Sequence, residues 1–340
     1  MKILGIETSC DETSVAVVED GAIILSNVTA SQIDIHAAFG GVVPEVASRH
    51  HVEVITAIVD EALLQSAATW STIDAIAVTC GPGLLGALLV GVSAAKGYAV
   101  ATGLPLIGIH HIAGHVAAAM LERPLWGQPF LCLVVSGGHT EILRVDGSFH
   151  FSRLGGTLDD AAGEAYDKIA RQLGLTYPGG PHIDALAQTG NPSAFAFPRA
   201  LMDDETYDFS FSGLKSSVAN TLNRARMQGL PVSSPDVAAS FQSAIVDVLE
   251  AKVLKAVRAT GLSHVVVAGG VAANHGLRIR MNASATQHGY EVIFPSPALC
   301  TDNGAMIATC AYPLLCEQKR SEMDLNAYAT LSLATWQDFW

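Results

Sequence analysis

Two histidines four residues apart carry the clearest chemical signal in the sequence. His111 and His115 lie in segment 110–115 (HHIAGH), between an apolar run and a helical pattern over 116–121. If the helix extends back through this segment, both imidazoles lie on one face, one turn apart. That spacing lets a helix offer two ligands to one metal ion. The structural alternative is that one histidine caps the strand-to-helix turn and the other packs beside it.

The residue after the first histidine of the pair narrows the chemistry. A metalloprotease of the His-Glu-x-x-His type has a glutamate there as its general base. This chain has Ile112 instead. The sequence therefore permits a metal pair and argues against a zinc peptidase.

Asp302 is a third candidate ligand, placed at the start of the last predicted helix. If the two halves of the chain face each other, Asp302 approaches the histidine pair from the second half. Two histidines and one carboxylate, with open positions left, suit Zn²⁺ or Fe²⁺. The competing use of Asp302 is a helix N-cap.

Two glycine turns follow predicted strands. The loop 136–140 (SGGHT) contains paired glycines, so backbone N–H groups can approach a phosphate or carboxylate closely. The alternative is a plain hairpin turn. Gly269 and Gly270 precede a helix with Asn274 in its first turns, which combines close approach with a helix N-terminus. Such a turn is also common for packing alone.

Asp11 and Glu12 form an acidic pair in the first loop. Either can orient a nucleophile or act as a base, although adjacent side chains generally point apart and do not share a proton. The structural alternative is solvation or a hydrogen-bonding role.

The elements that position these residues follow one order twice. In the first half we expect strands at 3–6, 14–19, 22–28, 73–78 and 105–109, and helices at 44–63, 84–100 and 111–121. In the second half we expect strands at 130–135, 141–145, 149–154, 264–268 and 291–294, helices at 158–173, 236–260 and 272–288, and a last helix from 302. An irregular insert is expected at about 177–213.

This order predicts an α/β fold with two β-β-β-α-β-α-β-α lobes around a cleft. It is the duplicated architecture of actin, sugar kinases and heat-shock chaperone ATPases, an analogy that does not fix a function. The expected lobes are 1–125 and 126–340, and the loops at the strand ends should line the cleft.

Composition and charge limit the function classes. The 340 residues are half hydrophobic and 15% charged, which is typical of a compact enzyme. The most membrane-like run, 84–95, is shorter than the ~20 residues of a span, and no signal peptide is visible, so a cytoplasmic location is expected. A net charge of −13 repels phosphate backbones. A nucleic acid would need a local basic patch or another subunit.

Six ordered motifs resemble the bacterial TsaD family, the tRNA threonylcarbamoyladenosine synthase subunit. They are 6–13 (IETSCDET), 40–49 (GGVVPEVASR), 81–84 (GPGL), 110–115 (HHIAGH), 135–140 (VSGGHT) and 300–306 (CTDNGAM). The resemblance runs from Lys2 to about Ala311. It implies the actin-like fold and the transfer of a threonylcarbamoyl group from threonylcarbamoyl-adenylate to N6 of adenosine 37, in tRNAs that read codons beginning with A.

The resemblance also implies roles for particular residues. The family's metal ligands, for one Fe²⁺ or Zn²⁺ per subunit, fall on His111, His115 and Asp302. Its substrate contacts fall on Val134, Val135, Ser136, Gly137, Gly138, Asp167, Gly180, Asp184 and Asn274. For deprotonation of the attacking amine, the candidates are Asp11, Glu12 and His139.

The partners implied by the resemblance are tRNA, the paralogous scaffold subunit TsaB and the small ATPase TsaE. Segment 323–340 lacks the basic, proline-bearing ending expected of relatives. Two rival functions remain open on the residues alone. An ATP-dependent small-molecule kinase of the same fold would use the glycine loops for ATP, and a non-catalytic binding module would not need the histidines.

Overall fold

The computed structural model describes all 340 residues and divides them into two compact units. Unit 1 consists of Met1–Trp126 and Pro295–Trp340, and unit 2 consists of Gly127–Phe294. The expected division into 1–125 and 126–340 differs from this result, because the C-terminal segment returns to unit 1. There the apolar helix α11 (Gly304–Cys316) packs against strands β1 and β2.

Unit 1 is built on a five-stranded sheet with the order β3-β2-β1-β4-β5. Its strands are β1 (Lys2–Glu7), β2 (Glu12–Glu19), β3 (Ile23–Ser31), β4 (Ala75–Gly81) and β5 (Leu106–His110). The first three strands form the expected antiparallel meander, and β4 and β5 run parallel to β1. The central strands β1 and β4 are almost entirely buried, as expected for a sheet that is covered on both faces.

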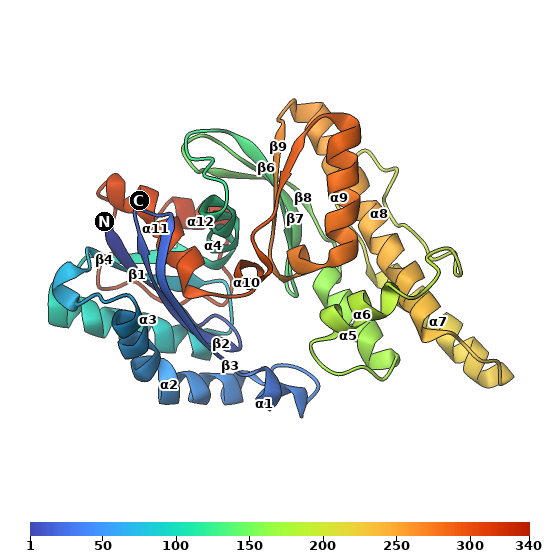
Figure 1. Cartoon of the computed structure of the whole chain (residues 1–340), viewed down its shortest axis with the longest axis horizontal. Helices are drawn as coiled ribbons and strands as arrows, with labels where there is room; N and C mark the ends of the chain where they lie inside the picture. Colours follow the sequence, from blue (N-terminus) through green and yellow to red (C-terminus); the bar gives the residue numbers. More distant parts are fainter. The chain divides into compact units, whose positions relative to one another are not determined.

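Helices cover this sheet on both sides (Figure 1). The helices of unit 1 are α1 (Ile33–Ala37), α2 (Pro44–Gln65), α3 (Leu85–Thr102), α4 (His111–Ala118), α10 (Pro297–Cys300), α11 and α12 (Leu333–Gln337), with 3₁₀ turns at Trp70–Thr72 and Ala119–Leu121. Helices α2 and α3 pack on each other and on the sheet, and α4 packs on α11. Trp336 of α12 donates its indole N–H to the carbonyl of Gly108 on β5 (2.9 Å), so the C-terminal tail is part of unit 1.

Helix α3 is longer than the apolar run counted in the sequence. By length and composition alone it is long and apolar enough to cross a membrane, although such a helix is also found in protein cores. In unit 1, α3 packs against β4 and α2, with Ala87, Leu88, Val92 and Ala95 buried.

Unit 2 repeats the sheet of unit 1. Its strands are β6 (Phe130–Val135), β7 (Thr140–Val145), β8 (Phe151–Gly156), β9 (His264–Ala268) and β10 (Glu291–Ile293). Their order is β10-β9-β6-β7-β8, again an antiparallel meander followed by two parallel strands. The two units therefore share one topology, which confirms the predicted duplicated α/β fold.

The helices of unit 2 depart more from expectation. They are α5 (Ala162–Gln172), α6 (Gly179–Ala187), α7 (Ser212–Gln228), α8 (Ser234–Thr260) and α9 (His275–His288), with a 3₁₀ turn at Gly270–Ala273. Helix α5 starts four residues later than predicted. Asp159, which was expected in its first turn, instead accepts backbone hydrogen bonds from Phe211 (2.8 Å) and Ser212 (3.2 Å). The supposedly irregular insert contains α6, and α7 was not predicted at all.

Candidate functional site

Helix α4 brings the two predicted histidines together. It begins directly after β5, and the side chain of His110 accepts a hydrogen bond from the N–H of Ile112 (3.1 Å), which caps the helix. The capping role therefore falls to His110, and His111 and His115 remain available as a pair. Their ring centroids are 4.6 Å apart. The predicted helical geometry of this segment is confirmed.

Asp302 completes the group, but from within the same unit. Its Oδ1 lies 3.2 Å from Nε2 of His115 and 3.6 Å from Nε2 of His111. The expectation that it arrives from a second lobe is wrong, because residue 302 belongs to unit 1 with both histidines. The competing N-cap role is taken by Asn303, whose side chain accepts from the N–H of Met306 (2.9 Å).

The three side chains make a chemically coherent donor set for a metal ion. Their ligand atoms all lie within 4.8 Å of one another. Two imidazoles and one carboxylate leave further coordination positions open, which fits Zn²⁺ or Fe²⁺.

When no cation is bound, the charges in this group favour an ionised Asp302 and a protonated His111. Burial opposes ionisation of Asp302, but His111 and His115 outweigh it and lower the pKa of Asp302 to about 2. Burial likewise opposes the charge on His111, but Asp302 and Glu7 raise its pKa to about 9. A metal ion that binds through His111 would therefore displace a proton from it at neutral pH.

Glu7, at the end of β1, orients the His111 ring by contacting its Nδ1 atom. This fully buried carboxylate accepts hydrogen bonds from the N–H of Ser9 and the hydroxyl of Thr79, both at 2.5 Å. Its Oε2 also lies 3.3 Å from Nδ1 of His111. The arrangement holds Nδ1 toward Glu7, so that Nε2 faces Asp302. Nδ1 of His115 is buried without a hydrogen-bond partner, so the two imidazoles are held differently.

We expect Glu7→Gln to weaken metal binding roughly 10–100-fold, because outer-shell carboxylates both orient and polarise a ligating imidazole. Competition with a chromophoric chelator measures the affinity directly. Glu45→Gln, at an exposed position of α2, is the matched control. Equal affinities for the parent and Glu7→Gln would contradict the role of Glu7.

The acidic pair in the first loop also belongs to unit 1. Burial is the main cause of the raised pKa of Asp11, and Asp302 adds to it. Burial, then Asp302 and Asp11, raise the pKa of Glu12 to about 7. Glu12 accepts from the hydroxyl of Ser31 at 3.3 Å. Both carboxylates thus lie close enough to the His111–His115–Asp302 group for their charges to interact with Asp302.

The predicted glycine loop of unit 2 joins β6 to its antiparallel neighbour β7. It lies at the carboxyl end of β6, which runs parallel to β9, and ligand sites are common at the carboxyl ends of parallel strands in α/β sheets. Gly137 and Gly138 are exposed, and a Cβ on either would meet no atom within 4 Å. The loop is anchored by the N–H of Gly163, which donates to the carbonyl of Ser136 (3.1 Å). The N–H of His139, in the same loop, donates to Oγ of Ser136 (3.1 Å). Val134 and Val135 are buried in β6.

The second predicted glycine turn packs against the first. Gly269 has φ +93°, and a Cβ there would lie 2.5 Å from the carbonyl oxygen of Val135. Only glycine fits this position without displacing the backbone. The structure therefore brings two turns, predicted separately, to one place in unit 2.

The remaining predicted substrate residues tie helices together. Oδ1 of Asp167 accepts from the N–H of Gly179 (2.7 Å), at the start of α6, one residue before the half-buried Gly180. Oδ2 of Asp184 accepts from the N–H of His275 (2.9 Å), at the start of α9. Asn274 caps α9 by accepting from the N–H of Leu277 (2.8 Å). Each residue therefore fixes a helix end in unit 2.

Gln242 on α8 is a member of this network that the sequence analysis missed. Its Nε2 donates to Oδ1 of Asp184 (3.0 Å), and its Oε1 accepts from Nδ2 of Asn274 (2.8 Å). The sequence offers no signal for this role, because Gln242 stands in an ordinary helical pattern.

We expect Gln242→Met to lower the free energy of unfolding by about 1–3 kcal/mol, because it leaves the buried Asn274 amide without its acceptor and removes the Gln242 hydrogen bond to Asp184. Denaturant unfolding measures the change. Gln228→Met, at the exposed end of α7, should change stability by less than about 0.5 kcal/mol. A loss no larger than that of the control would show that the Gln242 bridge contributes little.

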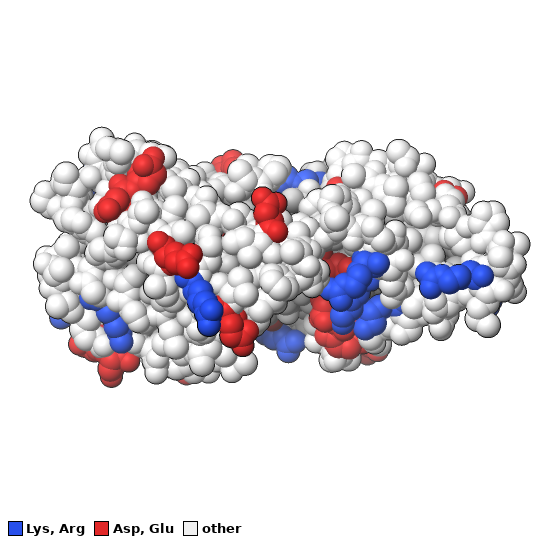
Figure 2. All heavy atoms as spheres, turned by 90° about the horizontal axis from the view of Figure 1, so that it is seen from below, with Lys and Arg blue, Asp and Glu red and all other residues white.

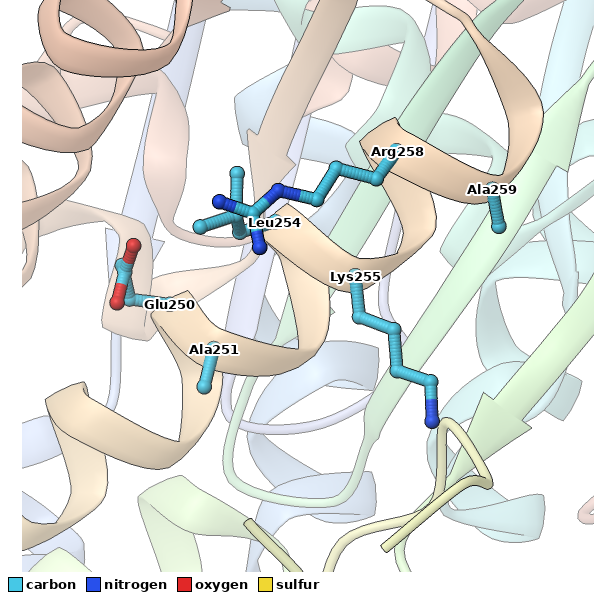
Figure 3. Close-up of a pocket in the computed structure, with 6 residues that line it drawn as sticks. All are labelled: Glu250, Ala251, Leu254, Lys255, Arg258 and Ala259. Carbon is cyan, nitrogen blue, oxygen red and sulfur yellow. The ribbon is translucent and has the colours of Figure 1, made fainter. Parts of the chain in front are cut away.

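A depression of about 460 Å³ lies on the outer surface of α8 (Figure 3). All of its lining residues come from this one helix, namely Glu250, Ala251, Leu254, Lys255, Arg258 and Ala259. It contains none of the predicted site residues and no group of metal ligands, so we do not assign it to the reaction.

The fold and site define the class of protein. Two sheets of identical topology make this a two-lobed α/β protein of the actin-like ATPase fold. HypF from T. kodakarensis has this fold, with a TM-score of 0.62 at 16% identity over 95% of this chain and 49% of that one. The activator of 2-hydroxyisocaproyl-CoA dehydratase from Clostridium difficile also has it, with a TM-score of 0.54 at 14% identity over 94% and 97% of the two chains.

Sequence comparison shows the family to which the chain belongs. The family model for TsaD, tRNA N6-adenosine threonylcarbamoyltransferase, matches residues 23–309. The enzyme of that name from Geobacillus thermodenitrificans is 54% identical over 97% of this chain and 96% of its own length. The one from Clostridium perfringens is 53% identical over 97% and 98%. The chain belongs to the TsaD family of tRNA N6-adenosine threonylcarbamoyltransferases, and it is a transferase that modifies tRNA.

Proposed function

We propose that this chain transfers a threonylcarbamoyl group from threonylcarbamoyl-adenylate to N6 of adenosine 37, in tRNAs that read codons beginning with A. The observation that carries the proposal is the His111–His115–Asp302 group, which offers a coherent set of metal ligands in a member of this family. The reaction is an acyl transfer in which the exocyclic amine attacks the carbamoyl carbon and AMP departs.

In this proposal His111, His115 and Asp302 would hold a divalent ion, Fe²⁺ or Zn²⁺. The ion would supply positive charge that stabilises the negative charge on the departing adenylate. Glu7 keeps His111 in the orientation that this role needs.

The donor is held in unit 2 by the residues carried over from the family. Backbone N–H groups of Gly137 and Gly138 contact its phosphate, which their exposed and unobstructed positions support. Asn274 and Asp184 border the adenosine, and Asp167 and Gly180 shape the same region.

The attacking amine must lose a proton, and three residues are candidates to accept it, namely Asp11, Glu12 and His139. Glu12 is the best supported, because its pKa of about 7 matches a base that works near neutral pH. The negative charge of Asp11 would then help to keep the pKa of Glu12 raised.

Partners complete the proposal. The chain works in the cytoplasm with a paralogous scaffold subunit, TsaB, and a small ATPase, TsaE, while a separate enzyme makes the adenylate. A shared tRNA surface would offset the repulsion between an RNA and a chain with a net charge of −13.

Reconstitution with tRNA and threonylcarbamoyl-adenylate, with and without the partners, tests the proposal. Mass spectrometry of the digested tRNA should show threonylcarbamoyladenosine, and metal analysis should show one ion per chain. Phosphoryl transfer from ATP to a small molecule, without nucleoside modification, would instead identify the kinase of the same fold. That rival leaves the His-His-Asp group without a role.

A further inference from the structure

The acidic charge of the chain is unevenly divided between its units. Unit 1 contains 6 Lys and Arg against 17 Asp and Glu, a net charge of −11. Unit 2 contains 13 Lys and Arg against 15 Asp and Glu, a net charge of −2. A polyanion is therefore repelled mainly by unit 1, and a local basic surface for it is better sought in unit 2.

Helix α7 is the most unusual element of unit 2. Of its 17 residues only Leu214 and Val218, both in the first half, are buried. The second half contains the exposed Met227 (89%), and Figure 1 shows this end of α7 extending beyond the other helices of the unit. Most helices in proteins are stabilised by packing of an apolar face. The second half of α7 lacks such packing, which indicates a surface built for a partner.

The charges on α7 are all of one sign. The helix contains Lys215, Arg224 and Arg226 and no acidic residue. Lys215 is paired with Asp160 (2.6 Å), but neither Arg224 nor Arg226 forms an ion pair, and both are exposed. In Figure 2, basic atoms lie at the right-hand end of the molecule, and no acidic atoms border them on this face.

The exposed side chains form one continuous face. At about 100° per residue, Asn220, Asn223 and Met227 lie along its middle, and Arg224 and Arg226 lie on either side. The buried residues occupy the opposite face. Arginine and asparagine are among the side chains that contact phosphate and sugar oxygens in nucleic-acid complexes.

We propose that the exposed half of α7 binds the sugar-phosphate backbone of the tRNA substrate. The helix supplies two guanidinium groups without ion pairs and two amides, and all four can donate hydrogen bonds to phosphate and sugar oxygens. This assignment rests on the tRNA specificity of the family and is independent of the metal site. The metal-site variants should therefore lose modification but keep tRNA affinity.

The test is tRNA binding by the chain purified with its cellular partners. Arg224→Ala/Arg226→Ala should raise the Kd for tRNA about tenfold or more at about 0.15 M salt, because two phosphate contacts are lost. It should also lower the slope of log K against log salt by up to about 2. In turnover assays the KM for tRNA should rise, while the KM for the adenylate and kcat at saturating tRNA stay the same.

Arg144→Ala/Arg258→Ala is the matched control, because these arginines of unit 2 are also exposed and form no ion pair. Both double variants change the net charge equally. A weaker tRNA affinity in the α7 variant alone supports the assignment. Unchanged affinity, or an equal loss in both variants, would overturn it.

Discussion

The His111→Ala/His115→Ala variant is expected to lose tRNA modification by at least about a thousandfold while it keeps its fold. A metal ion supplies several kcal/mol of charge stabilisation, and each 1.36 kcal/mol is a factor of ten in rate. Removing two of three protein ligands should prevent metal binding altogether. The product is measured by mass spectrometry of tRNA nucleosides, and the metal by elemental analysis of the purified protein.

Two further variants make this result interpretable. Asp302→Asn keeps the shape of the third ligand and removes its charge, so it should also lose metal and activity. His150→Ala removes an imidazole that is 56% exposed, in unit 2, and should behave like the parent. Circular dichroism checks that each variant is folded. Full activity in a metal-free double variant would end the metal hypothesis.

The Glu12→Gln variant is expected to lower kcat about 10²–10⁴-fold, the usual contribution of a general base. In the parent, the rate should fall as the pH drops and Glu12 becomes protonated. The midpoint of this fall should lie at or below the pKa of about 7, because a bound cation near Asp302 lowers the pKa of Glu12. Glu53→Gln, on the exposed surface of α2, is the control.

The same carboxylate should affect stability when metal is removed by a chelator. The ordinary pKa of a glutamate is 4.5, and that of Glu12 in the folded chain is about 7. Because the pKa is higher in the folded chain, the contribution of Glu12 to stability is fully present below pH 4.5. This contribution is lost as the pH rises through 7. Above pH 7, Glu12→Gln should therefore raise the free energy of unfolding. The gain is up to about 3 kcal/mol, and solvent screening reduces it.

These two readouts separate base catalysis from a structural role. Loss of activity together with a gain in stability at high pH supports Glu12 as a buried functional base. Retained activity in Glu12→Gln, with loss in Asp11→Asn, would move the role to Asp11. A variant less stable than the parent at every pH would show that Glu12 serves the fold.

Much of the fold was predictable because its signals are local. Helix α2 shows a clear helical period after Pro44, and the buried strands of both sheets are short apolar runs between turns. Helix α7 was missed because it buries only two residues and has no apolar stripe to detect. The start of α5 was misplaced because Asp159 is recruited by a loop about fifty residues away.

The candidate site was predictable to a similar extent. The histidine spacing alone indicated a shared ligand face, and two glycine turns were recognised from their backbone freedom. The origin of Asp302 was not recognised, because no local pattern reveals that α11 packs in unit 1. Glu7 offered a weak signal, an acidic residue at the end of a buried strand. Gln242 offered none, since its partners are far away in the sequence.

The order in which the chain passes through its two units determines when the candidate metal site can assemble. Both imidazoles are made early, but Asp302 follows only after the whole of Gly127–Phe294 has been synthesised. A nascent chain on the ribosome thus displays two of the three donors for most of its elongation. The complete group of three donors exists only once translation is nearly finished, so a metal ion that needs all three would be acquired late in the synthesis of the chain.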